Sequence, residues 1–389
     1  MSIYSGCNNI KDCDDASDEE RCSLLKITSN YDKATAPKLG EAKANEILLK
    51  AKIINFDFID TLNYEVGITV ELRFEWIDPN IDFEDAKNVE NEGQEFRTVP
   101  QSQTEKIWLP IKQLAHDNAV LGKVIKEDPF ILGVKIKSSP EERSVHDPLE
   151  SLIYPGVNNP LIAIQKRKIT FRCNFYVMNF PFDGDDCQFY FSLPKHENNN
   201  IIFTKDDKAT PYEGQRILNE FKIKSIKTLT TNSASKTSFV LTVQLERHYK
   251  QHLITFFLQS FLLWFLSYLT LFIAIEDFSN RFMGSITTLL VLASLLGSMQ
   301  ESLPKTAYFK GIDIWFNWFL ANIFLIILLH IIVDYLRKTD SRIVPGHMPV
   351  IHQNVKDKSF YFNTIFKMVI VIINILFVIA YFIFSILIF

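Results

Sequence analysis

Apolar and polar side chains alternate most clearly between Tyr64 and Trp76. Apolar residues occupy every second position there, and charged or hydroxyl residues fill most of the gaps. A period of two predicts a strand that buries one face. The pattern returns from Phe239 to Leu245, and other short runs are separated by Pro, Asn, Asp and Gly turns. The region from about residue 45 to 250 is therefore predicted to form an extracellular antiparallel β-sandwich.

Four apolar runs follow this region, at Leu253–Ile275, Phe282–Gln300, Ile314–Val333 and Met368–Phe389. Each is close to the ~20 residues with which a helix crosses a bilayer. The pattern predicts a four-helix transmembrane bundle. We divide the chain into an N-terminal segment (1–40), the β-sandwich (41–248), three spans (249–336), a short cytoplasmic loop (337–358) and a fourth span (359–389).

Charge predicts the orientation of these spans. Basic residues gather between the third and fourth runs, at Arg337, Lys338, Arg342, Lys356, Lys358 and Lys367. Positive loops stay on the cytoplasmic side, so both termini should lie outside the cell. The membrane that the spans cross is then expected to be the plasma membrane. The outer environment is oxidising and allows cysteines to pair. A translocated domain needs a signal peptide, and none is visible in MSIYSGC, so we expect the natural chain to begin earlier.

Composition excludes several classes of function. The net charge of −4 argues against a nucleic-acid partner. No nucleophile elbow, metal-ligand spacing or phosphate loop occurs, and the predicted spans contain a lone His330 rather than an ionisable cluster. The sequence therefore predicts that the protein is not an enzyme and that it needs no cofactor.

One short loop carries chemistry. Cys173 and Cys187 bracket CNFYVMNFPFDGDDC, which includes Phe180-Pro181-Phe182-Asp183. On a β domain that precedes four spans, this loop resembles the signature loop of the Cys-loop receptors, the pentameric ligand-gated ion channels. Two further segments resemble that family, Trp76–Pro79 and the linker LPKTAYFKGIDIW at Leu303–Trp315.

The resemblance implies a pentamer, made with four further homologous or identical subunits, and a pairing of Cys173 with Cys187. It also implies contacts that couple agonist binding to the spans. Phe180, Pro181 and Phe182 would press on the membrane end of the channel, while Asp183 and Asp60 would pair with Arg247. Lys305 and Lys310 would face them from the linker. An extracellular ligand could then bias the spans through this junction.

The second apolar run is the least apolar of the four. Its polar and small residues recur at spacings of three and four, which places them on one helix face. They are Asn280, Met283, Thr287, Leu290, Ser294, Gly297, Ser298 and Glu301. Such a face is too polar for lipid and predicts a water-filled pore. By resemblance, Leu290 is the hydrophobic gate.

The sequence leaves open whether the pore conducts cations or anions. The two residues before Arg281 are Ser and Asn, which match neither the cation-selective nor the anion-selective pattern of the family. The linker and Trp76–Pro79 resemble the GABA and glycine receptor branch, which favours anions. Acidic rings at Glu301, and at Glu276 with Asp277, would attract cations instead, and we favour cations on this field argument.

The expected agonist pocket is poor in aromatic residues. Family pockets form an aromatic cage between subunits, yet the segments FSLPKHENNN and TLTTNSASKTSF lack the usual Trp and Tyr. The remaining candidates for small-molecule or ion binding are Phe74, Trp76, His196, Tyr212 and Phe239. This depletion leaves a second hypothesis open, an accessory subunit that does not conduct without partner subunits.

The N-terminal segment CNNIKDCDDASDEERC resembles the end of an LDL-receptor class A module. The resemblance implies a Cys7–Cys22 disulfide and a Ca²⁺ site at Asp12, Asp18 and Glu19, since carboxylates are the ligands that Ca²⁺ prefers. Only part of the module is present, which equally suits a disordered remnant.

Overall fold

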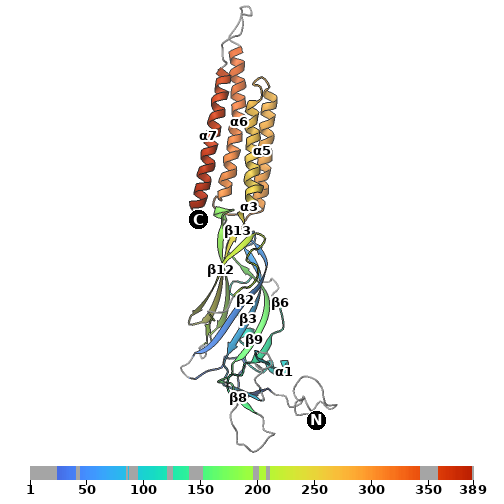
Figure 1. The fold of residues 1–389 in the computed structure, drawn as a ribbon, viewed down its shortest axis with the longest axis vertical. Helices are drawn as coiled ribbons and strands as arrows, with labels where there is room; N and C mark the ends of the chain where they lie inside the picture. The colour runs from blue at the N-terminus through green and yellow to red at the C-terminus, as the bar shows by residue number, and fades with distance from the viewer. Residues whose placement is uncertain are drawn as a thin grey trace, which may run out of the picture.

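The computed structural model describes residues 24–40, 44–84, 86, 95–120, 126–139, 152–195, 201–206, 211–341 and 358–387. The LDL-receptor-like segment, with Cys7, Cys22 and the three calcium candidates, lies outside these residues. So does His196. The four spans are grouped at one end of the molecule and the β domain lies at the other (Figure 1).

Thirteen strands build the β domain in the described residues. They are β1 (Leu25–Ile27), β2 (Asn45–Asp60), β3 (Glu65–Trp76), β4 (Ile81–Glu84), β5 (Arg97–Thr98), β6 (Lys126–Glu127), β7 (Ile131–Val134), β8 (Ile153–Pro155), β9 (Leu161–Arg172), β10 (Gly184–Pro194), β11 (Ile201–Thr204), β12 (Phe221–Asn232) and β13 (Lys236–Arg247). Two short helices, α1 (Gln101–Thr104) and α2 (Pro110–Gln113), precede β6.

Two of the sheets carry the sandwich. The larger follows the order β11-β2-β3-β9-β7-β5, with β6 paired to β9, and the smaller follows β10-β13-β12. A third sheet, β1-β4-β8, completes the far end. The pairings are antiparallel as predicted, except that β11 runs parallel to β2.

Aromatic side chains fill the space between the two larger sheets. The Phe171 ring on β9 lies 4.9 Å from that of Phe189 and 5.8 Å from that of Phe191, both on β10. On β3 the predicted alternation appears as buried Val66, Ile68, Val70, Leu72 and Phe74. The core thus spans both sheets, as an alternating apolar pattern requires.

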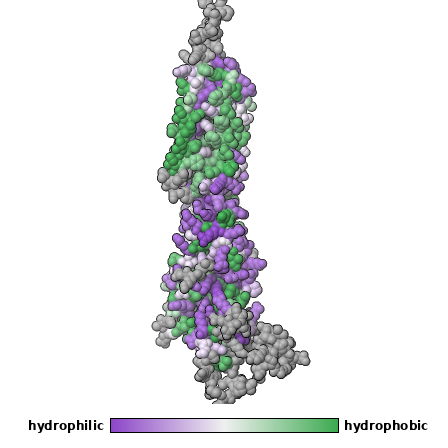
Figure 2. Space-filling model, viewed as in Figure 1, coloured by the Kyte–Doolittle hydropathy of each residue, from purple (hydrophilic) through white to green (hydrophobic). Residues whose placement is uncertain are grey.

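The first span is continuous from Tyr249 to Phe272 and combines α3 (Tyr249–His252), a π-helical segment η3 (Leu253–Leu258), α4 (Gln259–Leu269) and a 3₁₀ turn η4 (Thr270–Phe272). The others are α5 (Phe278–Glu301), α6 (Gly311–Ser341) and α7 (Lys358–Leu387). Among the described residues, these four helices are long and apolar enough to cross a membrane. Their surface is largely hydrophobic, whereas the β domain is largely hydrophilic (Figure 2). The chain is therefore a multi-pass membrane protein.

Candidate functional site

The junction between the β domain and the spans is built around the Cys173–Cys187 disulfide, which the structure confirms, with the two Cα atoms 5.3 Å apart. The loop that it closes contains a short 3₁₀ turn, η2 (Val177–Asn179), and a cis peptide bond between Phe180 and Pro181. Both of these last two side chains are buried. The disulfide limits the freedom of the loop, so its tip is held at the membrane end of the domain.

An ion pair connects this loop to the last strand. Arg247 Nε donates to Asp183 Oδ1 at 2.8 Å and Nη2 donates to Oδ2 at 3.0 Å, with both side chains 2% exposed. The guanidinium also lies 4.5 Å from the ring centre of Phe221 and 5.1 Å from that of Phe180. Asp183 and Arg247 therefore meet, as the sequence predicted, in a bidentate buried contact.

Asp60 is the last residue of β2. Its carboxylate accepts two hydrogen bonds from Asn63, one from the backbone N–H at 3.0 Å and one from the side-chain amide at 2.8 Å. These bonds cap the turn. Its predicted pairing with Arg247 remains a prediction.

The tip of the loop packs directly on the spans. The Phe180 ring lies 4.8 Å from that of His252, and the Phe182 ring lies 5.3 Å from that of Tyr249. Phe182 also lies 6.4 Å from Phe382 near the end of α7. A movement of the loop would thus reach the first and fourth spans together.

A neighbouring carboxylate supports the loop from inside. Asp185 Oδ1 accepts a hydrogen bond from the Tyr176 backbone N–H at 2.9 Å. Burial raises the pKa of Asp185, and this hydrogen bond opposes part of that rise.

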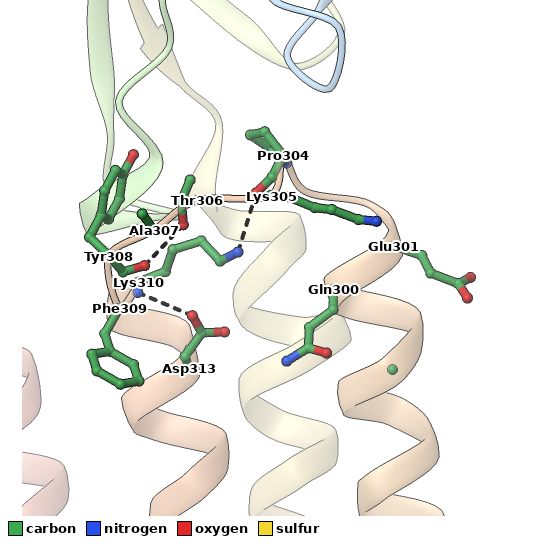
Figure 3. Close-up of a pocket in the computed structure, with 11 residues that line it drawn as sticks. Gln300, Glu301, Pro304, Lys305, Thr306, Ala307, Tyr308, Phe309, Lys310 and Asp313 are labelled. Carbon is green, nitrogen blue, oxygen red and sulfur yellow. Dashed lines mark hydrogen bonds between the residues drawn. The ribbon is translucent and has the colours of Figure 1, made fainter.

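The linker between α5 and α6 covers a hollow of about 570 Å³, shown in Figure 3. Lys310 is buried and its Nζ donates to the Pro304 carbonyl at 3.4 Å, while its backbone N–H donates to Asp313 at 3.1 Å. Lys305 and Glu301 point away from the helices. The Lys310 side chain thus points toward the linker and stabilises it, while Lys305 is exposed.

Sequence reasoning missed Tyr308, which lies close enough to the disulfide loop for the Val177 backbone to act on its pKa. Burial raises the pKa of Tyr308, with a smaller contribution from Tyr64, and the Val177 backbone opposes the rise. The aromatic residue inside LPKTAYF was the available signal. Tyr308 therefore places the linker beside the loop.

The predicted pore stripe lies on one face of α5. All eight of its residues are exposed in the single chain, and Leu290 is 65% exposed. The opposite face is buried against the other spans at Arg281, Ser285, Thr288, Leu292 and Met299. Arg281 Nη2 donates to Asn363 Oδ1 of α7 at 2.7 Å, so its charge points into the bundle.

The ligand candidates on the strands need correction. Phe74, Trp76 and Phe239 are 0%, 1% and 2% exposed, so they belong to the core and do not reach a ligand. Tyr212 is half-buried, stacks edge-on against Phe56 at 5.6 Å and donates to the Gln215 carbonyl. The alternation from Tyr64 to Trp76 already places Phe74 and Trp76 on the buried face of the strand, and their burial agrees with it.

Polar contacts connect the two segments in which the agonist pocket is expected, FSLPKHENNN and TLTTNSASKTSF. Ser192 Oγ donates to Asp117 Oδ1 at 2.7 Å, and Lys236 Nζ lies 2.6 Å from Asp117 Oδ2. Burial alone would raise the pKa of Asp117, yet the bonds from Lys236 and Ser192 lower it. The hairpin between β12 and β13 is thereby tied to the body of the domain. Within the described residues, no group of three or more His, Cys, Asp or Glu is arranged to hold a metal.

A β-sandwich joined by a disulfide-closed loop to four spans is the architecture of the protein, and the comparisons with known proteins show what the chain is similar to. A family model described as the neurotransmitter-gated ion-channel ligand binding domain matches residues 20–131. The gamma-aminobutyric acid receptor subunit beta of Lymnaea stagnalis is 25% identical over 327 residues, covering 80% of this chain and 60% of the relative. The gamma-aminobutyric acid receptor subunit pi of Rattus norvegicus is 24% identical over 317 residues, covering 79% of this chain and 65% of the relative.

The chain therefore spans less than two thirds of the length of these relatives. The disulfide loop and the four spans agree with these matches, which are all to subunits or domains of neurotransmitter-gated ion channels.

Proposed function

We propose that the chain is a subunit of a pentameric ligand-gated ion channel whose pore is lined by α5. The observation that carries the proposal is the division of α5 into two faces. One face packs against the other spans through residues such as Leu292, while the stripe around Leu290 is exposed. Five copies around one axis would turn this stripe into stacked rings around water.

Agonist binding would act through the junction described above. The ligand site would lie outside the membrane between subunits, and the disulfide loop would transmit the change to the spans. The relatives are named as gamma-aminobutyric acid receptor subunits, which supports a small-molecule agonist for this chain. No resident cofactor is needed for this mechanism.

The proposed location is the plasma membrane, with the β domain and the C-terminus outside. The end of α7 lies on the same side of the spans as the β domain (Figure 1). The basic residues between α6 and α7 support a cytoplasmic position for the opposite side.

The test is voltage-clamp recording from oocytes that express the full chain with Leu290→Thr. A polar residue at a hydrophobic gate should wet the pore and give a current without agonist. The matched control is Leu292→Thr, because Leu292 lies two residues away on the buried face. Reversal potentials in low-sodium and low-chloride baths would then identify the permeant ion.

A leak from Leu290→Thr, with none from Leu292→Thr, supports the pore assignment. Equal leaks from both variants would contradict the assignment of the Leu290 face to the pore. No current from Leu290→Thr, when surface labelling finds the protein, would contradict a homomeric channel. In that case co-expression with a family subunit tests whether the chain needs partners.

A further inference from the structure

Three helical segments meet at a buried polar cluster that no part of the proposed pore uses. Thr270 begins the last turn of the first span, Ser285 lies on the buried face of α5, and His330 lies on α6. Thr270 Oγ1 lies 2.8 Å from His330 Nε2 and 2.9 Å from Ser285 Oγ, and Ser285 Oγ lies 3.2 Å from the same ring nitrogen. The three residues are 7%, 0% and 1% exposed. We call them the His330 clasp.

The heavy-atom distances favour one arrangement of the protons. Thr270 Oγ1 lies 2.6 Å from the Ser267 carbonyl, which can only accept. A hydroxyl has one proton to donate, so with that proton on the Ser267 carbonyl the oxygen is left to accept from Ser285 and from His330 Nε2. In this arrangement the ring carries its proton on Nε2. Its Nδ1 is buried without a hydrogen-bond partner in the described part of the chain, which an unprotonated nitrogen tolerates better than an N–H.

The backbone of α5 is also unusually close to the first span at this level. A Cβ on Gly284 would lie 3.1 Å from the Thr270 methyl group, which is tight contact. Small residues at such a point let helices approach each other in a membrane. Gly284 and Ser285 therefore allow α5 to pack closely against the first span, and His330 of α6 contacts both helices at this point.

We propose that His330 is a positioning residue that sets the rotation of α5 and therefore which side chains face the pore. The clasp holds Ser285 inward, which turns Met283 and Thr287, two residues away on either side, outward. This inference rests on the proposed function, because it concerns the helix that lines the proposed pore.

The test measures rotation directly and requires no current. All five cysteines precede residue 188, so a cysteine introduced on α5 is the sole thiol of the spans. Thr287→Cys reports on the exposed face and Thr288→Cys on the buried face. Each is labelled on intact cells with a small thiol-reactive biotin reagent, and the ratio of the two labelling rates gives the orientation.

His330→Leu keeps a bulky side chain but removes the polar contacts of the ring nitrogen with Thr270 and Ser285. The ratio of labelling at 287 to labelling at 288 should fall roughly three- to tenfold, since each interhelical bond contributes a factor of about three. His330→Gln can place an N–H near the position of Nε2 and should restore most of the ratio. The control is Asn374→Leu, which breaks a buried bond between α6 and α7 and leaves α5 alone.

An unchanged ratio in His330→Leu would overturn the proposal, as would an equal fall in Asn374→Leu, which would indicate general loosening. Should His330→Leu fail to reach the surface, Ser285→Ala removes the α5 side of the clasp and must lower the ratio in the same direction. A silent Leu290→Thr channel would count against the proposed function, while the labelling ratio would still decide the role of His330.

Discussion

At the scale of single residues, the junction depends on one buried ion pair. Asp183 and Arg247 satisfy each other through parallel bonds, and two aromatic rings cover the guanidinium. Burying either charge without its partner is costly, because the lost hydration is not replaced. The pair therefore holds the disulfide loop to the final strand only while both members are present.

We predict that Arg247→Gln lowers the free energy of unfolding by about 3–5 kcal/mol, the typical cost of an unpaired buried charge. The control is Glu220→Gln, since Glu220 is 64% exposed and lies 3.9 Å from the same guanidinium. Its loss should cost less than about 1 kcal/mol. Thermal unfolding of the detergent-solubilised protein measures both, and comparable shifts would contradict this account of the pair.

A second buried group gives the β domain a dependence on pH. Arg167 Nη1 lies 3.0 Å from His116 Nε2, and a guanidinium can only donate, so the ring accepts and is neutral. Burial, and then the charge of Arg167, lower the pKa of His116 to about 4. In the unfolded chain the same group titrates near its ordinary value of ~6.5.

The unfolded chain therefore takes up a proton first as the pH falls, and stability is lost from about pH 6.5 down to pH 4. We predict a loss of about 2 kcal/mol between about pH 8 and pH 5 from this group. His116→Gln keeps an acceptor for Arg167 and should flatten that part of the profile. Melting temperatures measured across this range test it, and identical slopes for the two proteins would contradict the assignment.

At the scale of elements, the hydrophobic pattern predicted the existence of strands and spans better than their ends. The run Phe282–Gln300 became α5 at Phe278–Glu301, and Ile314–Val333 became α6 at Gly311–Ser341. Apolar composition marks the part of a helix inside the bilayer, whereas the helix continues into water as long as its backbone bonds are satisfied.

The hydrophobic pattern could not predict which residues of different elements contact each other. The spacing of residues on α5 separated its two faces, because every turn of a helix repeats the same directions. It could not show that Ser285 meets His330, or that Tyr308 reaches the disulfide loop. These contacts depend on how whole elements dock, and one sequence contains no direct record of that docking.

The docking of α7 gives a prediction at this scale. The Trp318 ring stacks on Phe377 at 4.2 Å, and its Nε1–H donates to Asn374 Oδ1 at 2.9 Å. Asn374 Nδ2 donates in turn to Asn322 Oδ1 at 2.9 Å. Asn374→Leu would leave both partners unpaired inside the bundle, at a cost of about 1–2 kcal/mol.

The expected result is a lower melting temperature in mild detergent for Asn374→Leu. The matched control is Ile375→Ala, at the next position, where the side chain is 54% exposed and faces away from the bundle. If Ile375→Ala proves as damaging as Asn374→Leu, the polar contacts do not anchor α7.

At the scale of the whole molecule, the proposed channel has an acidic ring at each end of α5. Glu301 closes the outer end and Glu276 precedes the inner end, and both side chains are exposed. In a pentamer each position would contribute five charges around the axis. The field of such a ring concentrates cations at its own mouth of the pore and acts on ions that enter from that side.

On the leaking Leu290→Thr background, Glu301→Gln should therefore reduce inward cation current, and Glu276→Gln should reduce outward cation current. The two variants serve as controls for each other, because the same charge is removed at opposite ends. Screening extends over ~8 Å at physiological salt but ~30 Å at 0.01 M, so both effects should grow as salt is lowered. In a pore that conducts anions, removing the outer ring would instead increase outward current, because anions would enter more easily from outside. Current–voltage curves that change identically in the two variants, or that ignore ionic strength, would show that these carboxylates do not face the ion path.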